Sequence, residues 1–189
     1  MDDHAAVGTL RGRGIALIGY RATGKTTVGR ILAKRIGRSF HDCDAEIEHR
    51  AGRSIRTIFE REGEAVFRDL ESQTICDLCQ QRPEAILATG GGAILRETNR
   101  QALARFGTVI WLTAPSEILV ERLRKDPNSR PALTAAGLLD EVAIILEARE
   151  PLYRDAADMI VDASLADPKW IAEEILRLIR SQGEKKESP

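Results

Sequence analysis

The most constraining feature of this chain is a glycine-bounded loop that follows a short apolar run near its amino end. The run Ile15-Ala16-Leu17-Ile18 leads into Gly19-Tyr20-Arg21-Ala22-Thr23-Gly24-Lys25-Thr26-Thr27, which fits the pattern G-x-x-x-x-G-K-[ST] between a strand and a helix. In this pattern the backbone N–H groups of the loop point at phosphate oxygens, and the following helix adds the positive end of its dipole. The segment therefore predicts a strand, a loop that binds a nucleoside triphosphate, and a helix.

The side chains of this loop have distinct expected roles. Lys25 is expected to reach the β- and γ-phosphates, and the Thr26 hydroxyl is expected to ligate Mg²⁺. The predicted nucleotide contacts are the loop residues Gly19, Arg21, Ala22, Thr23, Gly24, Lys25, Thr26 and Thr27. Because the loop does not say what is done with the triphosphate, the second site must lie elsewhere in the chain.

Length, charge and cysteine content narrow the class of protein. At 189 residues the chain suits one domain with its own core. Its 28 basic and 29 acidic residues give a formal charge of −1, which disfavours a nucleic-acid or membrane-surface binder. The sequence shows no secretory signal and no run long enough to span a bilayer, so we expect a cytoplasmic protein.

The chain has an odd number of cysteines, Cys43, Cys76 and Cys79, which suits a protein in a reducing compartment better than one held by disulfides. Cys76 and Cys79 form a C-x-x-C within a predicted helix, and no second Cys/His pair stands at a metal-ligand spacing from it. We therefore favour a structural role for these two residues over a redox or zinc site.

Between two polar ends, short apolar runs alternate with longer amphipathic stretches. The runs that predict strands are 15–18, 39–42, 85–88, 108–112 and 159–161. The predicted helices begin at Lys25 and then cover 63–81, 97–106, 116–124, 138–153 and 168–180. This alternation predicts an α/β fold with a parallel sheet and helices on both faces, and it leaves the strand order open. We expect one domain over residues 14–181, with flexible tails at 1–13 and 182–189.

The segment 125–137 fits neither a helix nor a strand, because it is rich in turn formers such as Pro127, Asn128 and Pro131. It sits between two predicted helices and holds Arg130 near its centre. A surface loop and a mobile lid over a bound nucleotide both fit this pattern.

The first candidates for a second binding site, for the molecule that accepts the phosphoryl group, are in Asp42-Cys43-Asp44. This segment comes directly after the second predicted strand. Carboxylates at the carboxyl ends of strands in an open α/β sheet lie along the edge where ligands bind. On an extended chain this spacing points both carboxylates to one face, so one can serve the metal while the other addresses an acceptor. The alternative is that Asp44 caps a helix starting at Ala45, which would leave Asp42 unexplained.

The third predicted strand runs into Thr89-Gly90-Gly91-Gly92. Three glycines remove every side chain where another group must approach the backbone closely. The aspartate that often ends this strand in nucleotide-binding chains is missing, so Asp42 is the expected carboxylate for the Mg²⁺ shell.

Together these residues indicate a kinase for a small hydroxylated acceptor. An aspartate placed as a base suits a neutral alcohol that must lose a proton, whereas the acceptor of a nucleotide kinase is already anionic. The GTPase motifs N-K-x-D and D-x-x-G do not occur in the sequence.

Seven blocks, in order, resemble the shikimate kinase family. They are Gly24-Lys25-Thr26-Thr27-Val28-Gly29-Arg30, Phe40-His41-Asp42-Cys43-Asp44 with Glu46-Ile47-Glu48, Gly52-Arg53-Ser54-Ile55, Gly63-Glu64 with Phe67-Arg68, Gly90-Gly91-Gly92, Arg130-Pro131-Ala132-Leu133 and Arg149-Glu150-Pro151-Leu152-Tyr153. The resemblance implies a P-loop fold similar to nucleoside monophosphate kinases, a three-layer α/β/α with a central five-stranded parallel sheet, substrate-binding helices and a lid at about 125–137. It implies Mg²⁺-dependent transfer of the γ-phosphoryl group of ATP to the 3-hydroxyl of shikimate, the fifth step of chorismate synthesis.

The resemblance also implies roles for the matched residues. Asp44 binds the shikimate hydroxyls and acts as the base, and Asp42 supports Mg²⁺ through water. Arg68 and Arg149 pair with the shikimate carboxylate, which suits the guanidinium fork. The remaining implied pocket residues are Phe59, Phe67, Gly90, Gly91 and Gly92.

For the nucleotide side, the resemblance places Arg130 over the phosphates, so the implied catalytic group is Lys25, Asp44 and Arg130. The adenine contact falls to Arg122 or Arg124, and the spacing to Arg130 does not choose between them. The segment 161–168 is similar to the adenine loop of the family.

Three positions depart from the commoner family pattern. Ala22 stands where many members have glycine, Thr26 where many have serine, and Cys43 where threonine is usual. Thr26 keeps the hydroxyl for Mg²⁺, and Ala22 is not one of the two glycines that the general motif requires, so we expect modest effects.

Two alternative functions stay open. A related kinase for another hydroxy acid, such as gluconate, would keep the phosphate loop but has no evident need for both aspartates and both arginines. A silent nucleotide-binding regulator would be expected to have lost a charge at Lys25, Asp44, Arg130 or Arg149, and all four are present. We expect a monomer that binds neither nucleic acid nor membrane.

Overall fold

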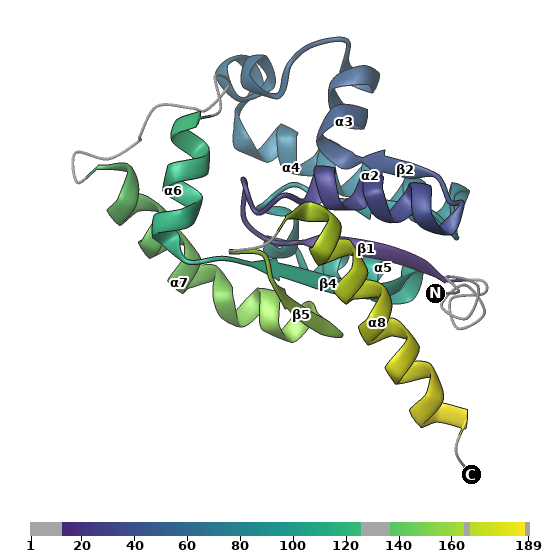
Figure 1. The fold of residues 1–189 in the computed structure, drawn as a ribbon. Helices are drawn as coiled ribbons and strands as arrows, with labels where there is room; N and C mark the ends of the chain where they lie inside the picture. The colour runs from purple at the N-terminus through teal and green to yellow at the C-terminus, as the bar shows by residue number, and fades with distance from the viewer. Residues whose placement is uncertain (1–12, 126–136, 165–166, 188–189) are drawn as a thin grey trace.

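The computed structural model describes residues 13–125, 137–164 and 167–187. Five short strands form one parallel sheet (Figure 1). The strands are β1 (Gly14–Ile18), β2 (Phe40–Asp42), β3 (Ile86–Ala88), β4 (Gly107–Thr113) and β5 (Met159–Asp162). Their order across the sheet is β2-β3-β1-β4-β5, and every neighbouring pair is parallel. The predicted α/β class with a five-stranded parallel sheet is therefore confirmed. The strands β1 and β3 are apolar and buried on both faces, whereas the edge strand β2 is half-buried.

Helices connect the strands. They are α2 (Lys25–Ile36), α3 (Cys43–Ala51), α4 (Ile55–Gln81), α5 (Glu97–Phe106), α6 (Ser116–Lys125), α7 (Leu138–Ala156) and α8 (Pro168–Glu187), with the short 3₁₀ helix η1 (Ala93–Leu95) before α5. Among the described helices, none combines the length and apolar character that a membrane span requires.

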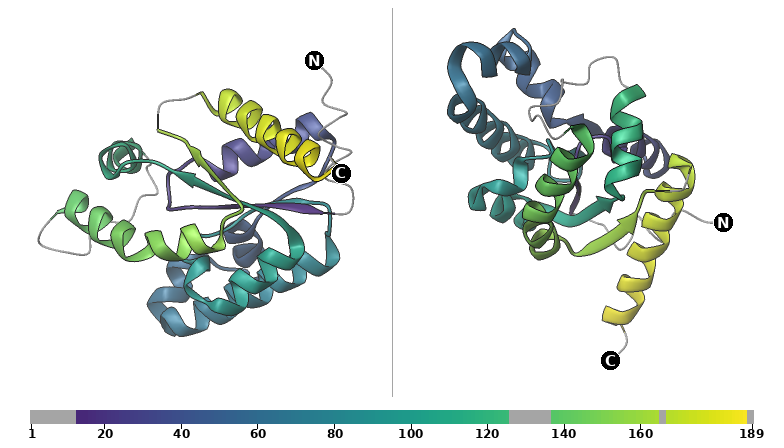
Figure 2. Two further views of the ribbon diagram at one scale, coloured as in Figure 1. Left: turned by 90° about the horizontal axis from the view of Figure 1, so that it is seen from below. Right: turned by 90° about the vertical axis from the view of Figure 1, so that its left-hand side faces the viewer.

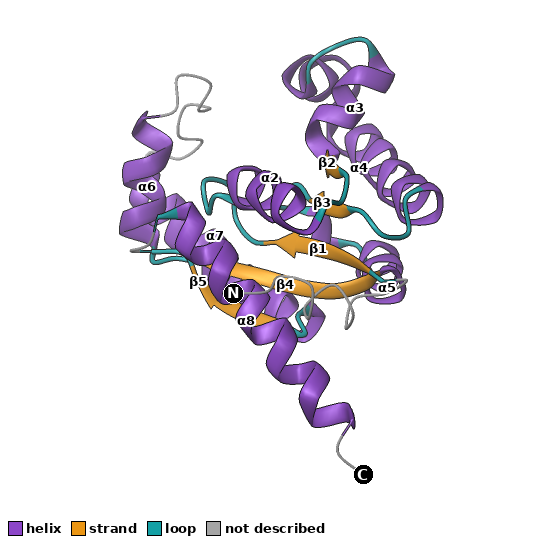
Figure 3. Cartoon of the chain, turned by 45° about the vertical axis from the view of Figure 1, so that its right-hand side comes forward, coloured by secondary structure: helices purple, strands orange, loops and turns teal. Residues whose placement is uncertain are grey.

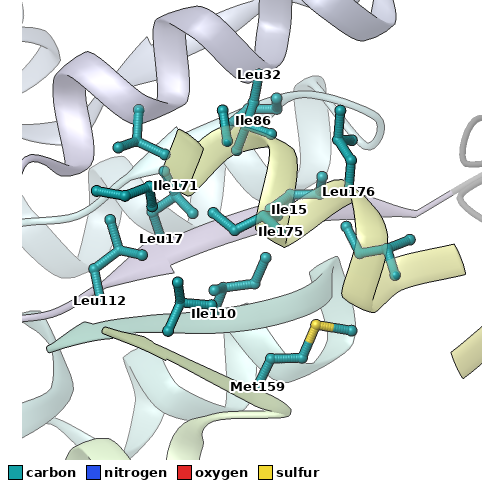
Figure 4. Packing of buried hydrophobic residues seen from close by; sticks show 14 of the residues in the cluster. Ile15, Leu17, Leu32, Ile86, Ile110, Leu112, Met159, Ile171, Ile175 and Leu176 are labelled. Carbon is teal, nitrogen blue, oxygen red and sulfur yellow. The ribbon is translucent and has the colours of Figure 1, made fainter. Parts of the chain in front are cut away.

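The helices cover both faces of the sheet, and each face has its own core (Figure 2). On one face, α2 and α8 pack on alternate strand residues such as Ile15, Leu17 and Ile110, as Figure 4 shows. On the other face, α4, α5 and α7 pack on the intervening residues, such as Ala16 and Ile18. The two-residue periodicity of the strands thus divides one run of apolar residues between two cores.

The register of the sheet brings distant segments to one edge. Leu17 of β1 pairs with Ala88 of β3, and Ala88 in turn pairs with Asp42 of β2. The phosphate loop, the segment after Asp42 and the glycines after Thr89 therefore leave the sheet side by side. Figure 3 shows α3 beside β2 and, well apart from it on the other side of the picture, α6.

The polar region between β2 and β3 is more helical than predicted. The sequence predicts a helix from Gly63, whereas α4 begins at Ile55 after the N-cap Ser54, whose hydroxyl accepts a hydrogen bond from Thr57 N. Gly63 has φ 84° and ψ 173°, so it kinks the helix, and its positive φ suits a residue without a side chain. Beyond this kink, the second part of α4 packs on one face of the sheet through Ile75 and Leu78.

The cap of α3 also differs from the expectation. The sequence treats Asp44 as the capping alternative, but Asp42 is the N-cap, and its Oδ1 accepts hydrogen bonds from Asp44 N at 3.1 Å and Ala45 N at 3.3 Å. The chain therefore stops being extended at Asp42, and Asp44 lies in the first turn of α3. The two carboxylates still come together, through a strand-to-helix turn rather than through strand alternation.

At the carboxyl end of the chain, α8 continues to Glu187, beyond the predicted end of this helix at Arg180. The C-x-x-C residues Cys76 and Cys79 lie in α4. Cys79 packs against the core that α4, α5 and α7 form with the sheet.

Candidate active site

The phosphate loop is held by its own backbone. Lys25 is only 8% exposed, and its Nζ donates hydrogen bonds to Gly19 O at 2.8 Å and Tyr20 O at 2.7 Å. The Thr23 hydroxyl also donates to Tyr20 O, at 2.8 Å. Burial lowers the pKa of Lys25 to about 8, although the negative charges of Asp44 and Asp42 oppose this shift. The loop is thus closed on itself, with a buried cation at its centre.

Ala22 occupies the most unusual backbone conformation in this loop. Its φ is 65°, and it is the only described residue other than glycine with a positive φ. The left-handed region costs an L-residue about 1–2 kcal/mol relative to glycine. The sequence motif does not require glycine here, but the backbone conformation explains why glycine suits this position.

Thr26 and Asp42 meet as the sequence predicts for a metal site. The Thr26 hydroxyl donates to Asp42 Oδ2 at 2.6 Å, while the other oxygen of Asp42 caps α3. Thr27, the last loop residue predicted to contact nucleotide, is exposed in the first turn of α2. The structure therefore places a hydroxyl and a carboxylate together where the phosphate loop leads into α2.

Asp44 lies between the phosphate loop and a second buried carboxylate, Glu71. Its Oδ1 is buried and has no hydrogen-bond partner among the described residues. Burial is the main cause that raises the pKa of Asp44 to about 6; Asp42 and Glu71 raise it further, and Lys25 lowers it. An unpartnered oxygen with a raised proton affinity is suited to accept a proton.

Each of the three glycines after β3 approaches a different functional group. A Cβ on Gly90 would lie 2.7 Å from Asp44 Oδ1 and 2.8 Å from Glu71 Oε1. A Cβ on Gly92 would lie 2.5 Å from the Arg68 guanidinium nitrogens, and one on Gly91 would lie 3.1 Å from Arg21 N. The predicted close approach to this backbone is therefore present at all three positions.

Arg68 is held by acidic residues of its own helix. Its Nη1 donates to Glu71 Oε2 at 2.7 Å, and its Nε and Nη2 donate to Glu64 Oε1 at 3.2 and 3.1 Å. The Arg68 side chain is 13% exposed and that of Glu71 is 1% exposed. Glu71 Oε1 has no hydrogen-bond partner in the described part of the chain. This buried pair fixes a guanidinium beside Gly92, at the same edge as Asp44.

The second predicted arginine reaches the same glycines from α7. Arg149 Nη1 donates to Gly91 O at 3.1 Å, and the Tyr153 hydroxyl donates to the same oxygen at 2.5 Å. Arg149 and Arg68, which are far apart in the sequence, thus flank one glycine segment.

Two aromatic residues predicted to line the pocket lie together on α4. The ring centroids of Phe59 and Phe67 are 4.6 Å apart, and the Arg68 guanidinium lies 5.1 Å from the centroid of Phe67. Phe67 is buried with Ile47 and Ile58, so this pair also joins α3 to α4.

The two arginines predicted as alternatives for the adenine contact have different surroundings. Arg122 Nη2 donates to Ala163 O at 2.7 Å and Ser164 O at 3.1 Å, and its Nη1 donates to Ala22 O at 3.4 Å. Arg122 therefore bridges the phosphate loop and the segment after β5. Arg124 is exposed on α6 and makes no such bridge. Arg130 and most of the predicted lid, 126–136, lie outside the described residues.

Sequence reasoning gave no role to two residues that the structure places at this site. Glu71 stands three residues after Arg68 on the same helix, a spacing that could have indicated the pair. Tyr153 ends the last of the motif blocks quoted for the family resemblance, but nothing in the pattern shows that its hydroxyl reaches Gly91.

Comparison with known proteins gives a consistent result. The family model described as shikimate kinase matches residues 21–180. A shikimate kinase from Chromobacterium violaceum is 49% identical over 78% of this chain and 79% of its own length. Another from Syntrophus aciditrophicus is 45% identical over 90% of this chain and 92% of its own. The solved structure of shikimate kinase from Acinetobacter baumannii, in complex with shikimate, is 37% identical, with a TM-score of 0.86 over 94% of this chain and 98% of that one.

Proposed function

Because the chain belongs to the shikimate kinase family, we propose that it transfers the γ-phosphoryl group of ATP to the 3-hydroxyl of shikimate, giving shikimate 3-phosphate and ADP. The observation that carries this proposal is the meeting of a buried carboxylate, Asp44, and two arginines, Arg68 and Arg149, around Gly90–Gly92 beside the phosphate loop. A hydroxy acid needs both a base for its alcohol and cations for its carboxylate, and this site holds both.

Asp44 is the proposed base. As the 3-hydroxyl oxygen attacks the γ-phosphorus, its proton passes to Asp44 Oδ1, and the bond from phosphorus to the β-phosphate oxygen of ADP breaks. The pKa of Asp44 is raised to about 6, which gives this carboxylate more affinity for a proton than an exposed aspartate has. Because this pKa is still below 7, most of the carboxylate is ionised at neutral pH and can act as a base.

Lys25 and the phosphate loop are the proposed site for the triphosphate. Lys25 Nζ, which donates to Gly19 O and Tyr20 O in this structure, would instead donate to the β- and γ-phosphate oxygens. Arg122 is the proposed adenine contact, since it connects the loop with Ala163 and Ser164.

Thr26 and Asp42 would hold Mg²⁺. They present hydroxyl and carboxylate oxygens within 2.6 Å of each other, and Mg²⁺ prefers oxygen ligands shared between one or two carboxylates and substrate phosphates. When bound, the ion neutralises charge on the β- and γ-phosphates.

Arg68 and Arg149 are the proposed partners of the shikimate carboxylate, and Phe59 and Phe67 the apolar wall. Glu71 keeps Arg68 in place by a 2.7 Å hydrogen bond. The three cysteines are free thiols, which supports the cytoplasmic location expected from the sequence.

The test is ADP release from MgATP in the presence of shikimate, of gluconate, or of neither acid. The proposal predicts release that depends on shikimate, with a mass gain of one phosphate on that acid. Release that depends only on gluconate would favour the related kinase. Nucleotide binding without release for either acid would favour the regulatory alternative.

A further inference from the structure

The hydroxyl of Tyr153 is a buried polar group at this site to which the proposed chemistry gives no task. Tyr153 lies one turn after Arg149 on α7, and none of its surface is exposed. A buried tyrosine hydroxyl needs a hydrogen-bond partner, and here the partner is Gly91 O at 2.5 Å.

The ring that carries this hydroxyl is fixed from the side. Trp111 of β4 stacks on Tyr153, with ring centroids 5.5 Å apart and an interplanar angle of 12°. This contact with the sheet helps to set the direction from which the hydroxyl reaches Gly91.

Gly91 O accepts from two donors of the same helix. Arg149 Nη1 donates to it at 3.1 Å, beside the shorter bond from Tyr153. A carbonyl oxygen has two lone pairs, so both are used. Arginine has five N–H donors; one of them goes to Gly91 O, and the Arg149 side chain also contacts the Tyr153 hydroxyl. The other donors of the guanidinium can serve a carboxylate.

Gly91 is also held on its opposite side. A Cβ built on it would lie 3.1 Å from Arg21 N, 3.5 Å from Tyr20 C and 3.6 Å from Gly19 O, all in the phosphate loop. Because Gly90–Gly92 have no side chains, backbone contacts must hold the segment in place. The bonds from Ala93 N to Gly90 O and from Leu95 N to Gly92 O are local turns, whereas the Gly91 carbonyl connects the segment to α7.

We propose that Tyr153 is a positioning residue for Arg149: its hydroxyl fixes the Gly91 carbonyl between the phosphate loop and α7, and this carbonyl orients the guanidinium that binds the acceptor carboxylate. The inference rests on the proposed function, because Arg149 must meet a carboxylate for the orientation to matter. It also makes Gly91 the physical contact between the nucleotide half and the acceptor half of the site.

The test is steady-state kinetics of Tyr153→Phe, which removes one oxygen and keeps the ring on Trp111. We expect the KM for shikimate to rise about tenfold, the loss expected for a buried hydrogen bond of ordinary strength, while the KM for ATP changes less than about twofold. Trp111→Phe is the matched control for packing. It keeps an aromatic ring against Tyr153 and leaves the hydroxyl in place. It should therefore lower the melting temperature while the KM for shikimate stays within about twofold of the wild type.

A double mutant separates positioning from general support. If Tyr153 acts through Arg149, adding Tyr153→Phe to Arg149→Ala should raise the KM for shikimate no further. An unchanged KM in Tyr153→Phe, or the full tenfold factor on top of Arg149→Ala, would overturn the inference and leave the proposed function intact. A wild-type protein that does not phosphorylate shikimate would remove the proposed function, and this inference would fall with it.

Discussion

The nucleotide loop and the acceptor pocket lie at one edge of the sheet, but they are built in opposite ways. The loop is a single run of nine residues, 19–27, and its cation Lys25 is held by carbonyls of that same run. The acceptor pocket draws Asp44 from α3, Arg68 and Glu71 from α4, and Arg149 from α7. Its members meet only because parallel pairing brings the ends of β1, β2 and β3 together.

This difference separates the forces that hold the two halves. The loop is held by hydrogen bonds from the Lys25 and Thr23 side chains to backbone carbonyls of the same short run. A side-chain change in the acceptor pocket should therefore leave it intact. The pocket is held by buried charges, above all Arg68 with Glu71, and removal of one partner leaves the other charge buried and unpaired. We therefore expect changes in the pocket to affect shikimate and to spare ATP.

The largest expected effect belongs to Asp44→Asn. Without the base, turnover should fall by about 10²–10⁴-fold, while the KM for ATP stays within about twofold. The matched control is Asp69→Asn, which changes an exposed carboxylate of α4 and should be neutral. Near-normal turnover in Asp44→Asn would remove this residue from the role of base.

The same substitution should raise stability. The pKa of Asp44 is above its ordinary value, so the folded protein binds this proton more tightly than the unfolded chain does. The contribution of Asp44 to stability therefore falls as pH rises from about 4 to about 6, and at pH 7 the asparagine variant escapes that cost. A lower melting temperature for Asp44→Asn at pH 7 would contradict this account.

Arg149→Ala should have the next largest effect. It removes a charge partner of the acceptor carboxylate, so the KM for shikimate should rise about 30-fold or more. Arg177→Ala, on the exposed side of α8, is the control of equal charge. If only the KM for ATP rose in Arg149→Ala, the assignment of Arg149 to the acceptor pocket would be wrong.

The pH dependence of kcat/KM should show an acidic limb that comes from the acceptor pocket and an alkaline limb that comes from the nucleotide loop. As pH falls below about 6, protonation of Asp44 should reduce kcat/KM for shikimate about tenfold per pH unit. Above about pH 8, deprotonation of Lys25 in the free enzyme should reduce kcat/KM for ATP. An acidic limb that persists unchanged in the residual activity of Asp44→Asn would show that another group produces it.

The smallest expected effect is that of Ala22→Gly. Glycine relieves the left-handed conformation at φ 65° but adds freedom to the unfolded chain, so the net gain in unfolding free energy should be about 0.5–1 kcal/mol. The KM for ATP should change less than about twofold. Ala104→Gly, in the exposed interior of α5, should instead lose about 0.5–1 kcal/mol. Urea unfolding of both variants checks the opposite signs.

The nucleotide loop, which is built from adjacent residues, was also the part of the site that the sequence predicted well. A strand, a glycine-bounded loop and a helix follow from adjacent residues, and β1, the loop and α2 are where the sequence placed them. The polar helix α3 entered only as an alternative, with Asp44 as its cap, and the first part of α4 was not predicted. Both have weak apolar periodicity, and their caps, Asp42 and Ser54, decide where they begin.

The acceptor half needed three-dimensional information. Arginines and glutamates on helices are usually solvated, so the sequence did not predict a role for Glu71. Its role became visible only because the structure shows that Glu71 is buried on α4. Tyr153 likewise gained meaning only from its contact with Gly91. The family resemblance supplied Arg68 and Arg149, which residue patterns alone could not have promoted to ligands.

The most direct test of this two-part construction is calorimetric binding of ADP and of shikimate to Glu71→Gln and to the wild type. Glu71 contacts Arg68 and no residue of the phosphate loop in the described hydrogen bonds. We predict that the variant binds shikimate about tenfold more weakly, as expected for the loss of a charged hydrogen-bond partner, and binds ADP within about twofold of the wild type. Equal weakening of both ligands, or shikimate binding as tight as in the wild type, would contradict the account.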